Sequence, residues 1–151
     1  MKPATLAANV GIGLAAGLAG TAAMTVSSTL EQRICGREPS LAPANTARKV
    51  LGIEKFASDA AENRFSTLVH WGYGTGWGAV RGLLRGMGLP PAAATVGHFA
   101  SIWGGAIVML PALGVAPPVT TWGAREVAID VWHHAVYVVA TVVAYERLAR
   151  T

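Results

Sequence analysis

The sequence predicts an all-α integral membrane protein with four transmembrane helices and one amphipathic connector helix. Apolar residues make up 52% of the 151 residues and charged residues only 13%, whereas an ordinary soluble domain has about 25% charged residues. Much of the surface of a soluble domain this small lies in water, so it needs more polar side chains than this. The same composition excludes a disordered chain. Four stretches also approach the roughly 20 mostly apolar residues that a membrane span requires.

The first predicted span covers residues 5–30, because no charged side chain occurs from Pro3 to Leu30. A secretory signal peptide is the alternative for this segment, with Lys2 as its basic start and small residues at 21–23 as a cleavage site. The apolar run continues past that site, which favours a span. Gly13 and Gly17 form a GxxxG pattern within it. Small residues at this spacing allow two membrane helices to approach closely.

The predicted connector, residues 31–64, is the longest charged segment. Asn45 is suited to cap the start of a helix there. At 100° per residue, apolar side chains fall on one arc and charged side chains fall opposite. The apolar arc consists of Val50, Ile53, Phe56, Ala57, Ala60 and Ala61. We therefore expect one amphipathic helix that lies on the membrane surface or caps the bundle.

The second predicted span, residues 65–84, is rich in glycine. One row of glycines recurs every four residues and consists of Gly74, Gly78, Gly82 and Gly86. Gly72 and Gly76 form a second row. One face of this helix is therefore almost bare backbone, which predicts tight packing against a neighbouring helix. A contact for another subunit, a pigment or a lipid is the alternative.

Prolines delimit the third predicted span, residues 92–113. Pro90 and Pro91 suit a helix start, and the prolines at 111, 117 and 118 suit its end and a short loop. The fourth predicted span covers residues 124–147. Four spans place both termini on one side of the membrane, and we expect that side to be cytoplasmic.

Ionisable residues within spans are costly and mark candidate sites. Helical spacing and depth predict one polar layer of His70, Glu126, Asp130, His133 and His134, and a second layer of Arg81 and His98. Three interpretations of the first layer stay open. It forms structural hydrogen bonds between helices, it senses or conducts protons, or it binds a divalent transition metal. The metal set would be Asp130, His134 and His70, with Glu126 as a further ligand.

Several function classes find no support in the sequence. No HExxH motif is present, and no serine or cysteine nucleophile has a convincing base, so we expect no enzyme and no cofactor other than that metal. The net charge of +4 is not gathered into a basic stripe, which argues against nucleic acid as a partner. The expected partners are the lipid bilayer and other membrane subunits or further copies of the chain.

The pattern resembles the YagU-like family of small bacterial inner-membrane proteins over most of the chain. The resemblance rests on the Gly/Ala-rich first span, the charged connector, the His70-Trp71-Gly72-Tyr73-Gly74 segment, Trp103, the Pro111, Gly114 and Pro117 exit, Glu126 and the His134-Ala135-Val136-Tyr137 segment. The Asn-Pro-Pro-like element frequent in that family's connector is not evident, and Arg37-Glu38-Pro39 stands nearby instead. The resemblance implies a polytopic inner-membrane protein associated with acid resistance, with no established catalytic residues.

Three functions follow as hypotheses from these residues and from the resemblance. The first is a non-enzymatic membrane protein linked to acid stress through the His/carboxylate layer. The alternative is an accessory subunit of a larger energy-converting or transport complex, docked through the glycine-rich helix faces. A metal-binding membrane protein or enzyme is third.

Overall fold

The computed structural model describes residues 3–150, and this part of the chain is helical with no strand. Its elements are α1 (Pro3–Cys35), α2 (Ala42–Leu51), α3 (Asp59–Gly86), α4 (Pro91–Ala112), the 3-10 helix η1 (Val119–Thr121) and α5 (Ala124–Leu148). The all-α prediction is therefore confirmed for the described residues. Each of the four predicted spans lies in one of the four long helices, to within a residue at the ends.

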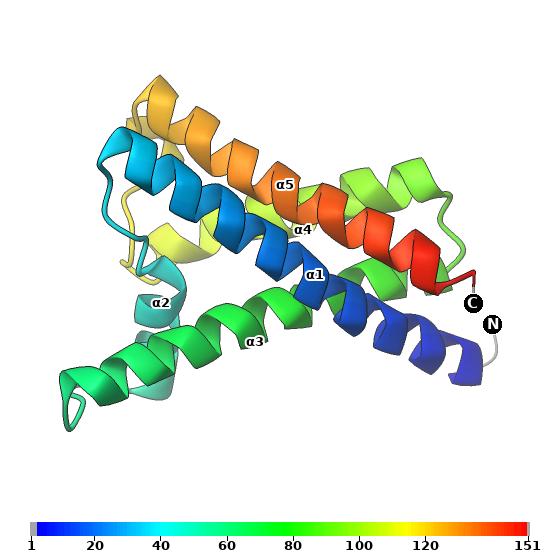
Figure 1. The fold of residues 1–151 in the computed structure, drawn as a ribbon, viewed down its shortest axis with the longest axis horizontal. Helices are drawn as coiled ribbons and strands as arrows, with labels where there is room; N and C mark the ends of the chain where they lie inside the picture. Colours follow the sequence, from blue (N-terminus) through cyan, green and yellow to red (C-terminus); the bar gives the residue numbers. More distant parts are fainter. Residues whose placement is uncertain (1–2, 151) are drawn as a thin grey trace.

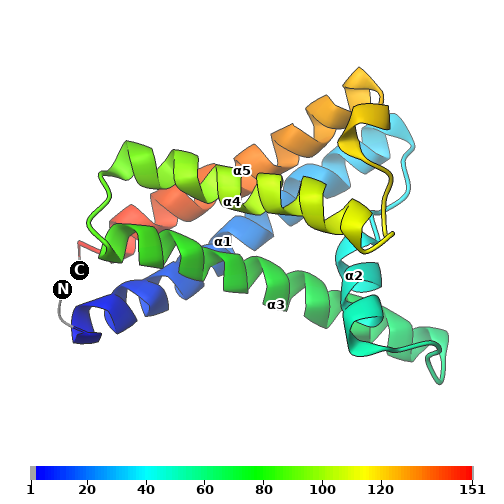
Figure 2. The same cartoon turned by 180° about the vertical axis from the view of Figure 1, so that it is seen from behind.

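The four long helices run back and forth between two ends of the bundle (Figure 1). The terminal end holds the start of α1, the turn between α3 and α4, and the end of α5. The connector end holds the end of α1, the helix α2, the start of α3 and the loop that leads into α5. Figure 2 shows from behind that α4 runs alongside α3 and α5. The helix α1 lies between α3 and α5 and packs against both.

Three helices are long and apolar enough to cross a membrane: Thr5–Cys35, Pro91–Ala112 and Ala124–Leu148. The second predicted span, residues 65–84, lies in α3, which is not among them. Glycines, His70 and Arg81 lower the hydropathy of α3, although the helix is long enough. The structure therefore supports a helical membrane protein with three clearly apolar helices, where the sequence predicted four spans.

The prediction of one continuous connector helix is wrong. The helix α2 ends at Leu51, because Gly52 takes a left-handed conformation with φ 66°. The next helix begins only at Asp59, where the Ser58 side chain caps it by accepting from the Ala61 N–H. The predicted apolar arc is thus divided between two helices and the non-helical stretch that joins them.

The predicted role of Asn45 as a cap is also wrong. The helix α2 begins at Ala42, so Asn45 already lies within it, and the preceding Leu41 makes no side-chain cap. Pro43 in the first turn favours this earlier start, since its fixed φ suits a helix and its missing N–H would have no partner there.

The helices α1 and α3 are in close backbone contact where they cross at their glycines. A Cβ atom at Gly78 would overlap the Gly13 carbonyl oxygen and lie 2.6 Å from Gly17 Cα. A Cβ atom at Gly82 would likewise meet the Asn9 backbone. By contrast, Gly76 has open space where its side chain would be. The row predicted from the four-residue spacing thus faces α1.

The other two glycines of the row meet side chains rather than backbone. A Cβ atom at Gly74 would overlap the Thr21 side chain, and one at Gly86 would lie 2.8 Å from the Leu6 side chain. The bare face of α3 is therefore occupied along its whole length by α1, and no second protein has access to it.

Candidate functional site

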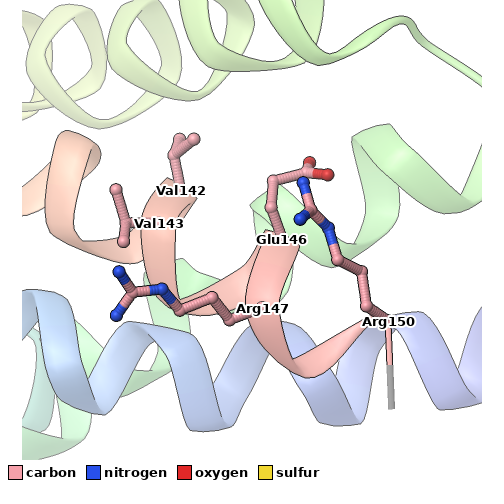
Figure 3. A pocket seen from close by; sticks show the side chains of 5 residues that line it. All are labelled: Val142, Val143, Glu146, Arg147 and Arg150. Carbon is pink, nitrogen blue, oxygen red and sulfur yellow. The ribbon is translucent and has the colours of Figure 1, made fainter.

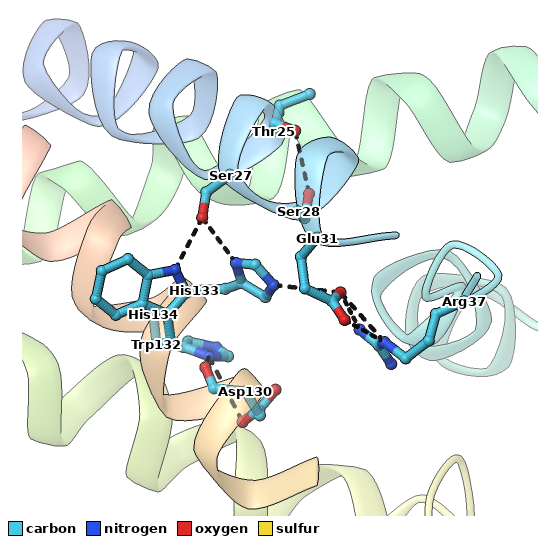
Figure 4. A network of polar contacts seen from close by, with 9 residues as sticks. All are labelled: Thr25, Ser27, Ser28, Glu31, Arg37, Asp130, Trp132, His133 and His134. Carbon is cyan, nitrogen blue, oxygen red and sulfur yellow. Dashed lines mark hydrogen bonds and ion pairs between the residues drawn. The ribbon is translucent and has the colours of Figure 1, made fainter. Parts of the chain in front are cut away.

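A network of polar side chains joins α1 to α5 at the connector end (Figure 4). We call it the α1–α5 network, and it consists of Ser27, Glu31, Arg37, Trp132 and His133. Ser27 and Glu31 lie one helical turn apart on the last part of α1, so both face α5. Arg37 follows α1 in the loop, and Trp132 and His133 lie in the third turn of α5.

His133 is the centre of this network and is only 6% exposed. Its Nδ1 lies 3.0 Å from Ser27 Oγ, which also accepts a hydrogen bond of 3.2 Å from Trp132 Nε1. Because the Ser27 oxygen accepts from the indole, its own hydroxyl hydrogen is free to be donated to Nδ1. This assigns the proton of the neutral imidazole to Nε2. The Nε2 atom lies 3.7 Å from Glu31 Oε2 and has no hydrogen-bond partner among the described residues.

Glu31 is held from the other side by Arg37. The guanidinium donates through Nε at 3.0 Å and through Nη2 at 2.9 Å, in the two-pronged geometry that suits a carboxylate. The Glu31 carboxylate raises the pKa of Arg37, first by these hydrogen bonds, and the negative charge of Glu126 acts in the same direction. The carboxylate facing His133 is therefore already paired with a permanent cation.

A second contact joins α4 to α5 beside this network. Trp103 Nε1 donates to Asp130 Oδ2 at 2.8 Å. His134 Nδ1 lies 2.8 Å from the Asp130 carbonyl oxygen and 3.6 Å from Asp130 Oδ2. The His134–Asp130 pair lies within one helix, so its charge state does not directly link two helices.

The predicted first layer is not one cluster. His70 faces α1, where its Nε2 lies 2.8 Å from Thr25 Oγ1. Glu126 folds back on its own helix and accepts from the Gly123 N–H at 3.0 Å, at the start of α5. The prediction used the depth of each residue in the membrane, and depth alone does not say which neighbouring helix a side chain faces. Because α1 lies between α3 and α5, His70 on α3 contacts α1 rather than the residues of α5.

The predicted second layer also separates into two sites. Arg81 is fully buried and donates to Glu146 at 2.8 Å and to Thr95 Oγ1 at 3.1 Å. His98 is fully buried as well, with its Nε2 3.1 Å from the Trp77 carbonyl oxygen. Each side chain has its own partners, and no hydrogen bond between the two occurs in the described chain.

Sequence reasoning missed two carboxylates that the structure places in these sites, Glu31 and Glu146. Glu31 is the first charged residue after the uncharged run from Pro3, so it marks the depth at which α1 leaves the apolar layer. His133 lies two to three turns into the antiparallel α5, near the same end. The common depth of Glu31 and His133 was the signal in the sequence that could have paired them. Glu146 lies one residue before the predicted end of the fourth span at residue 147 and was not singled out.

The predicted metal ligands are dispersed. His70 lies on α3 facing Thr25, while Asp130 and His134 lie on α5. Within residues 3–150, no three histidine, cysteine, aspartate or glutamate side chains are close enough together to hold a metal ion.

Comparison with known proteins finds no match to the chain among protein-family models, curated proteins or solved structures. The resemblance to the YagU-like family therefore stays a prediction.

Proposed function

We propose that the protein is a non-enzymatic, proton-responsive integral membrane protein in which the charge of His133 controls the contact between α1 and α5. The observation that carries this proposal is the geometry of the buried imidazole. It bridges Ser27 on α1 and faces the paired carboxylate of Glu31 at 3.7 Å without a hydrogen bond at Nε2. Histidine is the side chain whose charge ordinarily changes between pH 5 and pH 8.

Protonation of His133 weakens this contact, for three reasons. The imidazolium adds a charge to a site that is almost closed to water, which is unfavourable. It adds a second cation beside Arg37, which already occupies the Glu31 carboxylate through its hydrogen bonds. It also turns Nδ1 from an acceptor into a donor, so the Ser27 hydroxyl has to rotate. The contact between α1 and α5 is therefore stable at neutral pH, and its stability falls as the pH drops and His133 becomes protonated.

The proposed setting is the cytoplasmic membrane of a bacterium, with α3 as a fourth span beside the three apolar helices. Two observations support a spanning α3 despite its low hydropathy. Its bare glycine face is covered by α1, and its charged Arg81 is fully buried and paired with Glu146. The helix therefore exposes less polar surface to lipid than its sequence suggests. An association with acid resistance, which the family resemblance implies, agrees with a proton-controlled contact.

The test is a distance measurement between α1 and α5 in liposomes at pH 7.5 and pH 5. Spin labels are attached to cysteines at Ile34, which is 82% exposed, and Ala128, which is exposed, in a Cys35→Ser background. We expect the distance distribution of the parent to become longer and broader at pH 5. His133→Gln, which keeps a polar side chain without the titration, should show no such change.

The matched control is His134→Gln, because His134 pairs within α5 and does not bridge two helices. This variant should retain the full pH response of the parent. The proposal is wrong if the parent shows no change between the two pH values, or if His133→Gln responds as the parent does.

A second candidate function is an accessory subunit of a larger membrane complex. The observation that favours it is the outer side of α3, where Gly72 and Gly76 have open space. A hollow of about 310 Å³ lies there, lined by Tyr73, Gly76, Trp77 and Val80. Gly76→Leu should release the protein from such a complex during purification in mild detergent while the monomer still inserts. Recovery of only a monomer or homodimer from the parent would count against this candidate.

A further inference from the structure

The charge of the protein is distributed unequally between the two ends of the bundle. The connector end holds seven of the eight acidic residues, and seven basic residues lie in the same segments. The described part of the terminal end holds one acidic side chain, Glu146, and four arginines: Arg81, Arg85, Arg147 and Arg150. The positive net charge of the chain is therefore concentrated at the terminal end.

The one carboxylate at this end does not balance the last two arginines. Glu146 Oε1 lies 2.8 Å from Arg81 Nη2 and 3.2 Å from Arg85 Nε, so two cations already share it. The side chains of Arg147 and Arg150 make no hydrogen bond or ion pair with any residue in the range 3–150. Two guanidinium groups at the same helix end are thus left without a partner among the described residues.

These two arginines line a hollow whose other wall is apolar (Figure 3). The hollow has a volume of about 260 Å³ and is lined by Val142, Val143, Glu146, Arg147 and Arg150. The valines lie one to two turns closer to the middle of α5 than the arginines. Because α5 is apolar enough to cross a membrane and ends at Leu148, the hollow lies where the hydrocarbon meets the lipid headgroups.

We propose that this hollow binds an anionic phospholipid. Arg147 and Arg150 donate to the phosphate oxygens, a pairing for which the planar guanidinium is well suited. Val142 and Val143 contact the first methylene groups of an acyl chain, which a free phosphate ion lacks. The excess of cations favours an anionic lipid over a zwitterionic one, since the choline of the latter would meet positive charge.

This site also predicts an orientation. Basic residues near span ends are retained on the cytoplasmic side of bacterial membranes, and anionic lipids attract them there. An anionic lipid held by Arg147 and Arg150 would therefore agree with the expected cytoplasmic side for the termini. The inference does not depend on His133 and concerns the opposite end of the bundle.

The test compares lipid binding by native mass spectrometry of the full chain in detergent, with phosphatidylglycerol and phosphatidylcholine as probes. We expect the parent to prefer phosphatidylglycerol. The double variant Arg147→Gln, Arg150→Gln should lose roughly 30-fold in affinity for phosphatidylglycerol, because it lacks two positive charges next to the lipid headgroup. Its helical circular dichroism spectrum should be unchanged.

The matched control is Arg33→Gln, Arg64→Gln, which removes the same charge at the connector end, where neither arginine has an ion-pair partner among the described residues. It should bind phosphatidylglycerol as the parent does. Equal binding of the two lipids, an equal loss in the control, or full displacement of the lipid by millimolar inorganic phosphate would overturn the proposal. The last result would identify a free-phosphate site instead.

Discussion

Replacing Gly78 with alanine adds a single methyl group at the crossing of α1 and α3. The new Cβ would lie 2.6 Å from Gly17 Cα and overlap the Gly13 carbonyl oxygen. Carbon atoms in contact are separated by about 3.5–4.0 Å, so the helices have to move apart by roughly 1 Å. Both neighbours are backbone atoms of a helix, so no side chain can rotate away.

The cost of this separation follows from the contacts that it weakens. A gap of 0.5–1 Å forfeits about a quarter to a half of the attraction of each atom pair along the crossing. Overpacking of this kind typically costs about 1–3 kcal/mol. Alanine also favours the helix over glycine by about 1 kcal/mol. Gly76→Ala is the matched control, because it adds the same methyl group on the same helix in open space.

The assay is reversible unfolding in mixed micelles of dodecyl maltoside and SDS, followed by circular dichroism. We expect Gly78→Ala to be less stable than Gly76→Ala by about 1–3 kcal/mol, since the helix-propensity gain is common to both variants. Equal stability of the two alanine variants would show that α1 and α3 do not cross at these glycines, and would refute the reasoning.

Two further predictions use the same unfolding assay. Arg81→Gln removes the fully buried partner of Glu146 and should lower the free energy of unfolding by about 3 kcal/mol. The control Arg147→Gln breaks no pair within the described chain and should change it by less than about 0.5 kcal/mol. Similar losses in both variants would contradict a buried ion pair. Tyr137→Phe removes the hydroxyl that donates to the Gly74 carbonyl oxygen at 2.5 Å and should cost about 1–2 kcal/mol. No loss in that variant would mean that water replaces the hydroxyl.

Helix positions and the glycine face follow from local patterns, which is why the sequence predicts them. The four-residue spacing from Gly74 to Gly86 is a property of one helix. Which helix covers that face depends on tertiary packing, which a local pattern does not determine. The sequence therefore left a second subunit as an alternative to α1. The break at Gly52 was missed, because the apolar arc of the connector was read across a residue that ends the helix by taking a left-handed conformation.

The candidate site was predicted only in part, because depth in the membrane is easier to derive than direction around a helix axis. His133 was placed among the candidates for proton exchange at one end of the bundle, and its function there stays a prediction. His70 was placed at the same depth, yet it faces Thr25 on α1. Glu31 was assigned to the charged connector, although α1 continues through it to Cys35.

The ion pair between Arg81 and Glu146 constrains how the chain is assembled in a bilayer. In the proposed four-span arrangement, α3 reaches the membrane during synthesis 65 residues before its counter-ion is made. Until α5 arrives, α3 carries an uncompensated guanidinium and has low hydropathy, so its transfer from the translocation machinery into lipid is unfavourable. The final helix thus completes the integration of an earlier one, and biogenesis of the bundle becomes cooperative rather than strictly sequential.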